Sequence, residues 1–159
     1  RDQPRSRGLG DVYKRQGVRL LAIGDTGRLP ERTRKLLERS IEQTAGNTKI
    51  NLVLALSYGS RAEIAGAARK IAQKISAGEL RPDAITEETF GQYLDTAGMP
   101  DPDLLIRTSG EMRISNFLLW QISYAELYLT DTLWPDFSEQ DMEAAVKDYA
   151  RRTRRFGGI

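Results

Sequence analysis

The segment from Asp101 to Phe117, DPDLLIRTSGEMRISNF, carries the side chains of this chain that are best suited to hold a compact anion. An apolar run leads directly into Arg107, and Arg113 and Ser115 follow shortly after it. Guanidinium groups pair with phosphate oxygens two at a time and keep their charge at any working pH. A glycine at position 110 permits a close backbone approach to a ligand. The pattern indicates a diphosphate site, and simple surface ion pairs between each arginine and a nearby acid are the open alternative.

A single carboxylate, Glu126, lies in an otherwise apolar and aromatic stretch. A buried carboxylate requires either a cationic partner or a metal ion. Mg²⁺ prefers carboxylate and phosphate oxygens, so a metal-ligand role is open. On chemistry alone, an internal salt bridge between Glu126 and an arginine is favoured.

A second polar cluster, Tyr58 to Arg61, also follows an apolar run. Ser60 and Glu63 fit a capping box that opens a helix, which is a structural role. This structural role is the favoured interpretation, and the alternative is that Arg61 fixes a neighbouring phosphate loop. The segment Gly24 to Arg28 lacks the Gly-Lys-Ser/Thr ending of a P-loop, so it indicates a turn.

The composition narrows the chemistry that is available to the chain. The 159 residues include no cysteine and no histidine, which removes disulfides, thiolate nucleophiles and the commonest general base. Any reaction must therefore use carboxylates, hydroxyls, Arg, Lys and a hard, oxygen-bound metal. The 24 basic and 22 acidic side chains give a net charge of +2, too small an excess to indicate a nucleic-acid partner. No apolar run is long enough to span a bilayer, and a cytoplasmic location is expected.

Apolar runs with strand character alternate with helical patterns along the chain, which predicts an α/β fold with a mostly parallel sheet flanked by helices. Ligands bind such sheets at the carboxyl ends of the strands. Residues 1–16 lack an apolar period and are interpreted as a non-native or disordered leader, so that residues 17–159 carry the domain. The expected strands are Val18–Ile23, Ile50–Ser57, Asp103–Ile106 and Leu127–Thr130, and the expected helices are Pro30–Ala45, Thr86–Asp95, Asn116–Tyr124 and two that open at Ser60 and Ser138.

Three segments resemble the cis-prenyltransferase (undecaprenyl diphosphate synthase) family. RTSGEMRISNFLLWQISYAELYLTDTLWPDF, at 107–137, closely resembles the most characteristic stretch of that family. ALSYGSRAEI, at 55–64, is similar to its Tyr-Gly-x-Arg segment, and RRFGG, at 154–158, to its terminal Arg-x-Gly motif. Ser57 and Ser60 depart mildly from the family pattern, in which Asn and often Gly stand. The likeness covers residues 17–158, the C-terminal part of such a domain.

The resemblance implies roles for particular residues and a homodimeric assembly. It implies that Arg107, Arg113 and Ser115 bind the diphosphate of isopentenyl diphosphate, and that Arg61 supports the phosphate region. Glu126 matches the family carboxylate that is implicated in Mg²⁺ binding and in the dimer-side active site. The residues implied to act in catalysis are Arg107, Arg113 and Glu126, and those implied to complete a neighbouring subunit's site are Arg155 and Gly157.

The implied reaction joins isopentenyl diphosphate head-to-tail to an allylic diphosphate, with farnesyl diphosphate as the expected donor. The product is a cis-polyprenyl diphosphate lipid carrier for cell-wall precursors, and contact with a membrane surface is expected only through this product. The family's Asp-Gly-Asn-Gly-Arg motif, whose Asp binds Mg²⁺, is absent from the 159 residues. A polypeptide of these residues alone is therefore expected to be inactive. The alternatives are a noncatalytic partner subunit and, much less favoured, an RNA-binding module that uses the basic tail.

Overall fold

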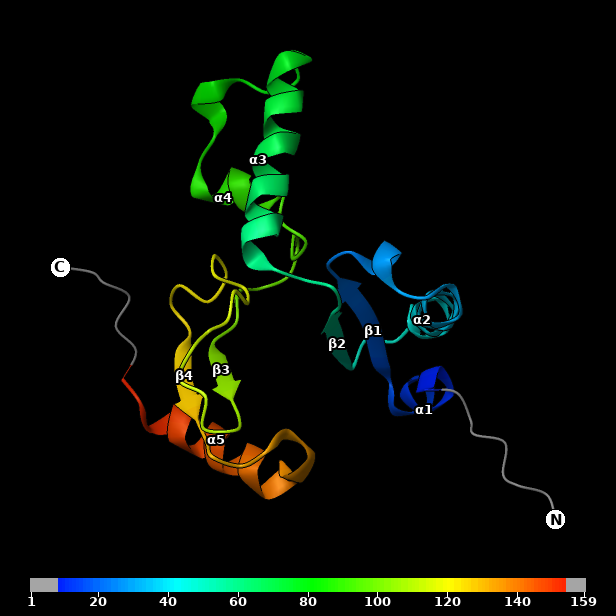
Figure 1. Cartoon of the computed structure of the whole chain (residues 1–159), viewed down its shortest axis with the longest axis vertical. Helices are drawn as coiled ribbons and strands as arrows, with labels where there is room; N and C mark the ends of the chain where they lie inside the picture. The colour runs from blue at the N-terminus through cyan, green and yellow to red at the C-terminus, as the bar shows by residue number, and fades with distance from the viewer. Residues whose placement is uncertain (1–8, 154–159) are drawn as a thin grey trace.

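A computed structural model describes residues 9–153, and residues 1–8 and 154–159 lie outside the description. Helices and strands alternate over the first half of the described residues, as the sequence predicts, whereas the last two strands follow one another without the predicted helix between them (Figure 1). Their bounds are α1 Leu9–Gln16, β1 Val18–Ile23, α2 Glu31–Thr44, β2 Ile50–Ala55, α3 Ser60–Ser76, α4 Glu87–Gly91, β3 Leu104–Arg107, β4 Glu126–Leu129 and α5 Glu139–Arg151. Within the described range, none of the helices combines the length and apolar character that crossing a bilayer requires.

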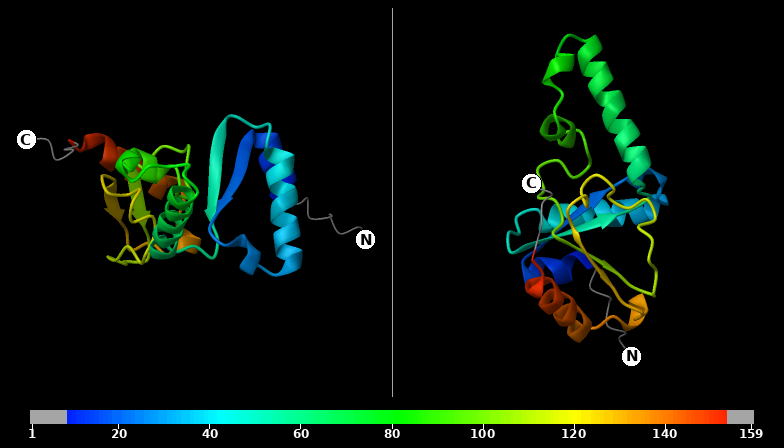
Figure 2. Two further views of the ribbon diagram at one scale, coloured as in Figure 1. Left: turned by 90° about the horizontal axis from the view of Figure 1, so that it is seen from above. Right: turned by 90° about the vertical axis from the view of Figure 1, so that its left-hand side faces the viewer.

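The strands form two parallel pairs. In the first pair β1 lies beside β2, with Val18 opposite Ile50, and in the second β3 lies beside β4, with Leu104 opposite Glu126. The expected parallel α/β class is thereby confirmed. The pairs are two separate two-stranded sheets among the described residues, and Figure 2 shows them in different parts of the molecule. The sequence predicts a single sheet, whereas no ladder of backbone hydrogen bonds joins β2 to β3 among the described residues.

The first strand pair is covered by α2 through a buried polar contact. Leu20 and Thr44 are both fully buried. The Leu20 N–H donates to Thr44 Oγ1 at 3.0 Å, so this contact fixes the depth of β1 against α2.

Helix α1 was not expected, because residues 1–16 were assigned to a leader. The Asn47 side-chain amide, just after α2, donates to the carbonyl oxygens of Tyr13 at 3.3 Å and Val18 at 2.8 Å. This amide links the end of α1 to β1 and satisfies carbonyl groups that a helix end leaves free.

Helix α5 packs on β4 and starts where the sequence predicts. Ser138 and Asp141 form a capping box, in which the Ser138 N–H donates to Asp141 Oδ2 at 2.8 Å. A second predicted helix, over Asn116–Tyr124, is wrong, because this segment is a succession of turns. Asn116 and Leu118 have positive φ angles of 61° and 47°, which an α-helix does not accommodate.

Candidate functional site

Arg107 is the last residue of β3 and carries an unsatisfied buried donor. Its carbonyl oxygen accepts the Thr130 N–H at 3.0 Å, which fixes its backbone against the chain that leaves β4. Its side-chain Nε is buried and has no hydrogen-bond partner among the described residues. Native proteins rarely leave a buried charged donor unpaired, because the lost solvation is expensive. The position of Nε at the carboxyl end of a parallel strand is one where an anionic ligand could pair with it.

The segment that follows, residues 107–116, is here called the arginine loop. Its backbone folds along the exit of β4, where the Gly110 N–H donates to the Thr130 carbonyl oxygen at 2.9 Å. Gly110 has a φ of +65°, and a Cβ at this position would lie 2.9 Å from Asp131 Oδ1. Only glycine meets both requirements without strain. The tight bend therefore depends on the residue type, as the sequence suggested.

Arg113 and Ser115 lie further along the arginine loop. Arg113 Nη2 pairs with Glu111 Oε2 at 2.8 Å, while 72% of its side chain stays exposed. This is the surface ion pair that the sequence left open as the alternative for each arginine. Ser115 is exposed and has a φ of 55°. The loop thus carries an arginine whose buried Nε has no partner among the described residues, a largely exposed arginine and an exposed serine.

Helix α3 begins against the end of the arginine loop. The predicted capping box is wrong, since Ser60 is the first residue of the helix and Gly59 precedes it as an N-cap without a side chain. Instead, the N–H groups of Ser60 and Arg61 donate to the backbone and side-chain oxygens of Asn116, each at 2.8 Å. Arg61 is exposed next to this contact. The structure therefore brings Arg61 and the arginine loop together.

Glu63 forms a buried polar centre that sequence reasoning missed as a site residue. Its carboxylate accepts the Tyr58 hydroxyl at 2.5 Å and the Asp95 N–H at 2.8 Å. The Gln121 amide donates to both carboxylate oxygens, at 3.3 and 3.2 Å. Burial, reinforced by the hydrogen bond to Glu63, raises the pKa of Tyr58.

The spacing of α3 contains the signal for that buried position. Glu63 precedes Ala67 and Ile71 by four and eight positions, and all three are buried. Residues four apart share one face of a helix. A carboxylate on the apolar stripe of a helix predicts a buried polar network.

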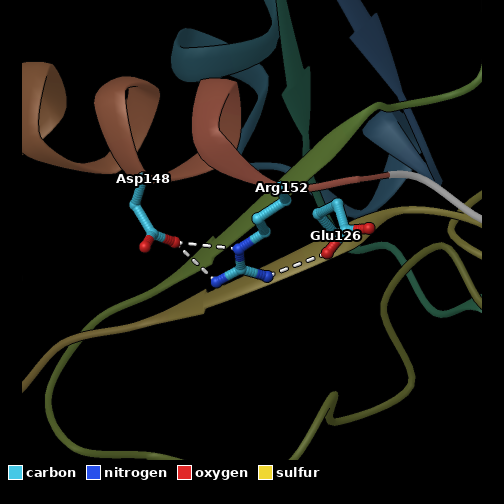
Figure 3. A network of polar contacts seen from close by, with 3 residues as sticks. All are labelled: Glu126, Asp148 and Arg152. Carbon is cyan, nitrogen blue, oxygen red and sulfur yellow. Dashed lines mark hydrogen bonds and ion pairs between the residues drawn. The ribbon is translucent and has the colours of Figure 1, made fainter.

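Glu126 is paired with Arg152, the residue that directly follows α5. Its Oε2 lies 2.9 Å from Arg152 Nη1, and Arg152 Nη2 lies 2.6 Å from Asp148 Oδ2. Figure 3 shows the guanidinium held between the two carboxylates. This pairing raises the pKa of Arg152. The salt bridge that chemistry alone favours for Glu126 is therefore present.

The register of the second strand pair separates Glu126 from Arg107. Glu126 begins β4 opposite Leu104, whereas Arg107 ends β3 opposite Leu129. Three residue steps along a strand correspond to roughly 10 Å. Glu126 thus lies at the amino end of β4, and the structure does not bring it to the carboxyl end where the arginine loop starts.

The described residues do not by themselves fit a Mg²⁺ ion. Within 9–153, no group of three or more His, Cys, Asp or Glu side chains is arranged to hold a metal. The expected ligand Glu126 already faces a guanidinium, which would repel a second cation. Arg155 and Gly157, which were expected to complete a neighbouring subunit's site, lie outside the described residues.

Comparison with known proteins places these features in a family. The family model described as "Putative undecaprenyl diphosphate synthase" matches residues 5–157. An isoprenyl transferase from Porphyromonas gingivalis is 55% identical over 140 residues, which cover 88% of this chain and 55% of the relative. The ditrans,polycis-undecaprenyl-diphosphate synthase of Escherichia coli is 51% identical over 144 residues, covering 91% of this chain and 57% of that enzyme.

A solved structure agrees with both the sequence match and the fold. The chain superposes with a TM-score of 0.90 and 43% identity on lavandulyl diphosphate synthase from Lavandula x intermedia in complex with dimethylallyl diphosphate, covering 94% of this chain and 64% of that one. The chain spans little more than half the length of the two curated relatives. The parallel strand pairs, the arginine loop and these matches agree, and the chain belongs to the undecaprenyl diphosphate synthase family of prenyltransferases.

Proposed function

We propose that this chain supplies the isopentenyl diphosphate end of an isoprenyl transferase active site. The observation that carries the proposal is the buried Nε of Arg107, which has no partner among the described residues at the carboxyl end of β3. A diphosphate oxygen is an acceptor of the right charge for this donor. Arg113 and Ser115 on the same loop add a second guanidinium and a hydroxyl, and Arg61 supports the loop from α3.

The proposed reaction is head-to-tail condensation of isopentenyl diphosphate with an allylic diphosphate, for which farnesyl diphosphate is the proposed donor. The product is a cis-polyprenyl diphosphate of the lipid-carrier class, made in the cytoplasm. The residues of this chain bind and orient the isopentenyl diphosphate so that its double bond faces the allylic carbon. Positioning of this kind supplies a large part of the rate enhancement in two-substrate reactions.

Magnesium enters the proposal as an ion carried by the diphosphate oxygens. Mg²⁺ is commonly bound through one or two carboxylates together with substrate phosphates, so the described residues need not form a complete cage. Glu126 is a candidate ligand only when Arg152 releases it. We also propose that a polypeptide of these 159 residues alone does not catalyse the condensation, because it lacks the Asp-Gly-Asn-Gly-Arg motif.

A homodimer is part of the same proposal. Several large apolar side chains on and after β4 are exposed in the single chain, namely Leu127, Leu129, Leu133 and Trp134. Exposed apolar groups of this density are typical of protein interfaces. Sedimentation of the chain at several concentrations tests this part, and a monomer at all of them would contradict it.

The central experiment is calorimetric titration of the chain with isopentenyl diphosphate, with and without Mg²⁺. The expected result is saturable binding that an Arg107→Ala, Arg113→Ala double variant abolishes. A matched control is Arg81→Ala, which removes an exposed arginine that pairs with Asp83 outside the arginine loop. Absence of binding by a folded parent chain would overturn the proposal and favour a noncatalytic partner subunit.

A further inference from the structure

The contact between the arginine loop and α3 centres on one side chain, Asn116. We propose that Asn116 is a positioning residue, which holds the arginine loop in its binding shape by capping helix α3 from outside the helix. This inference rests on the proposed function, because the loop it positions is the one proposed to bind diphosphate. Asn116 itself has no assigned role toward the ligand.

The first turn of α3 lacks a cap of its own. The first amides of a helix have no intrahelical acceptor and are normally satisfied by the side chain of the N-cap residue. The N-cap here is Gly59, which has no side chain to offer. Asn116, 55 positions later in the sequence, accepts the Arg61 N–H through Oδ1 at 2.8 Å, and its backbone oxygen accepts the Ser60 N–H at 2.8 Å.

A third hydrogen bond runs in the opposite direction between the same segments. The Leu119 N–H donates to Ser60 Oγ at 2.9 Å, and Ser60 is fully buried. The start of α3 and the segment 116–119, which leaves the arginine loop, therefore exchange donors and acceptors. Neither segment can shift without breaking bonds to the other.

Gly59 is required by Asn116 rather than by its own backbone conformation. Its φ of −157° is extended and open to any residue. A Cβ on Gly59 would nevertheless lie 2.9 Å from Asn116 Nδ2, which is too close for a real contact. The Asn116 amide cannot move aside easily, because its oxygen holds the Arg61 N–H. Glycine at 59 thus leaves the space that the cap from Asn116 needs.

The backbone around Asn116 needs an external hold. Ser115, Asn116 and Leu118 have φ angles of 55°, 61° and 47°, a region that non-glycine residues seldom occupy. Asn tolerates it better than most residues, while Ser and Leu are strained there. Strained segments persist when surrounding contacts determine them, and the three bonds to α3 provide such contacts. Since Ser115 is next to Asn116 and Arg113 is two residues further, the contact sets the position of both proposed ligand groups.

The variant that isolates the cap is Asn116→Gly. It keeps the positive φ and the backbone oxygen that binds the Ser60 N–H, and it removes the side chain that holds the acceptor of the Arg61 N–H. We expect the dissociation constant for isopentenyl diphosphate to rise about tenfold to a hundredfold, because small misplacements of binding groups are costly. The Arg61 amide is expected to lose protection from hydrogen exchange. Asn116→Asp keeps an acceptor at the same place, so it should retain this protection and lose less affinity.

A matched control is Thr86→Ala, which deletes the side-chain cap of α4, where Thr86 accepts the Thr89 N–H at 3.1 Å. It should leave the dissociation constant at the parent value. Gly59→Ala approaches the same contact from the other side and should weaken binding with the diphosphate groups intact. It also serves if Asn116→Gly does not fold.

The outcomes separate the inference from the function on which it rests. Parent affinity in Asn116→Gly or in Gly59→Ala, or an equal loss in Thr86→Ala, would overturn the positioning role. A folded parent chain that binds no isopentenyl diphosphate would overturn the proposed function. In that case hydrogen exchange of the Arg61 N–H would be the remaining test of the cap. Unchanged exchange of this N–H in Asn116→Gly would show that Asn116 does not cap α3.

Discussion

The charged side chains at the two ends of the β3–β4 pair differ in whether they have a partner. At the carboxyl end, the buried Nε of Arg107 has no partner among the described residues. At the amino end, Glu126 is bound to Arg152, which also holds Asp148. Both residues were candidates for the same site from the sequence. The structure separates them, since Arg107 has a buried donor without a partner among the described residues and Glu126 is already paired.

The two ends also differ in how deeply the nearby charged side chains are buried. From the carboxyl end the arginine loop runs to the first turn of α3, which also carries the buried Glu63, 9% exposed. The amino end depends on an ion pair whose side chains are 33% and 26% exposed. Buried networks fix geometry strongly, whereas partly exposed pairs contribute little and are screened by salt. Precise placement is therefore concentrated where ligand binding is proposed.

The largest effect is expected for a conservative substitution at the carboxyl end of β3. Arg107→Lys keeps the positive charge and removes the planar fork, including the buried Nε. We expect the affinity for isopentenyl diphosphate to fall by about tenfold to a hundredfold, which corresponds to about 1.5–3 kcal/mol for a charged hydrogen bond. Calorimetry on the folded variant measures it. Parent-like binding would mean that only the charge of Arg107 matters.

A smaller effect is expected at Arg113, because Glu111 competes for it at 2.8 Å. Arg113→Ala should weaken binding by roughly twofold to fivefold, since a largely exposed charge contributes up to about 1 kcal/mol. Glu111→Gln should strengthen binding, because it releases the guanidinium for the ligand. Titrations of both variants at one salt concentration provide the comparison. Weaker binding by Glu111→Gln would indicate that the pair orients Arg113 instead of occupying it.

The fold class and the start of α5 could be predicted from the sequence because they depend on local patterns. Alternating apolar runs identify parallel strands, and Ser138 with Asp141 identifies a helix start. The same reasoning failed at Ser60, where the cap comes from Asn116, 55 positions away. It also failed for 116–124, where contacts with α3 impose φ angles that local propensity does not favour.

The residues of the candidate site could be chosen from the sequence, but their grouping could not. Arg107 and Glu126 are both conspicuous in type and context. Their separation depends on strand register, in which Glu126 faces Leu104 and Arg107 faces Leu129. Register is a property of the paired strands and is not encoded in either segment alone.

Loss of the Glu126 carboxylate at the amino end of β4 should change ligand affinity and stability only weakly. Glu126→Gln is expected to leave the affinity of the single chain for isopentenyl diphosphate within about twofold, because roughly 10 Å of strand separates the two ends. It should lower the urea midpoint slightly, and the difference from the parent should shrink in high salt. Glu143→Gln is the matched control, since it breaks the exposed pair with Lys147 at 2.8 Å on α5. A large loss of affinity in Glu126→Gln alone would join the two ends into one site.

The smallest expected effect is a pH dependence of stability that involves Tyr58 and does not involve Glu126. The pKa of Tyr58 is raised above 10.0 by burial and by its hydrogen bond to Glu63. The unfolded chain, in which tyrosine ionises near pH 10, then loses this proton first, so the contribution of Tyr58 is present below pH 10 and is lost as the pH rises further. Urea midpoints at pH 9 and pH 11 should fall more in the parent than in Tyr58→Phe, whereas Glu126→Gln should fall as the parent does. Equal falls in the parent and Tyr58→Phe would show that Tyr58 does not couple the buried centre to pH.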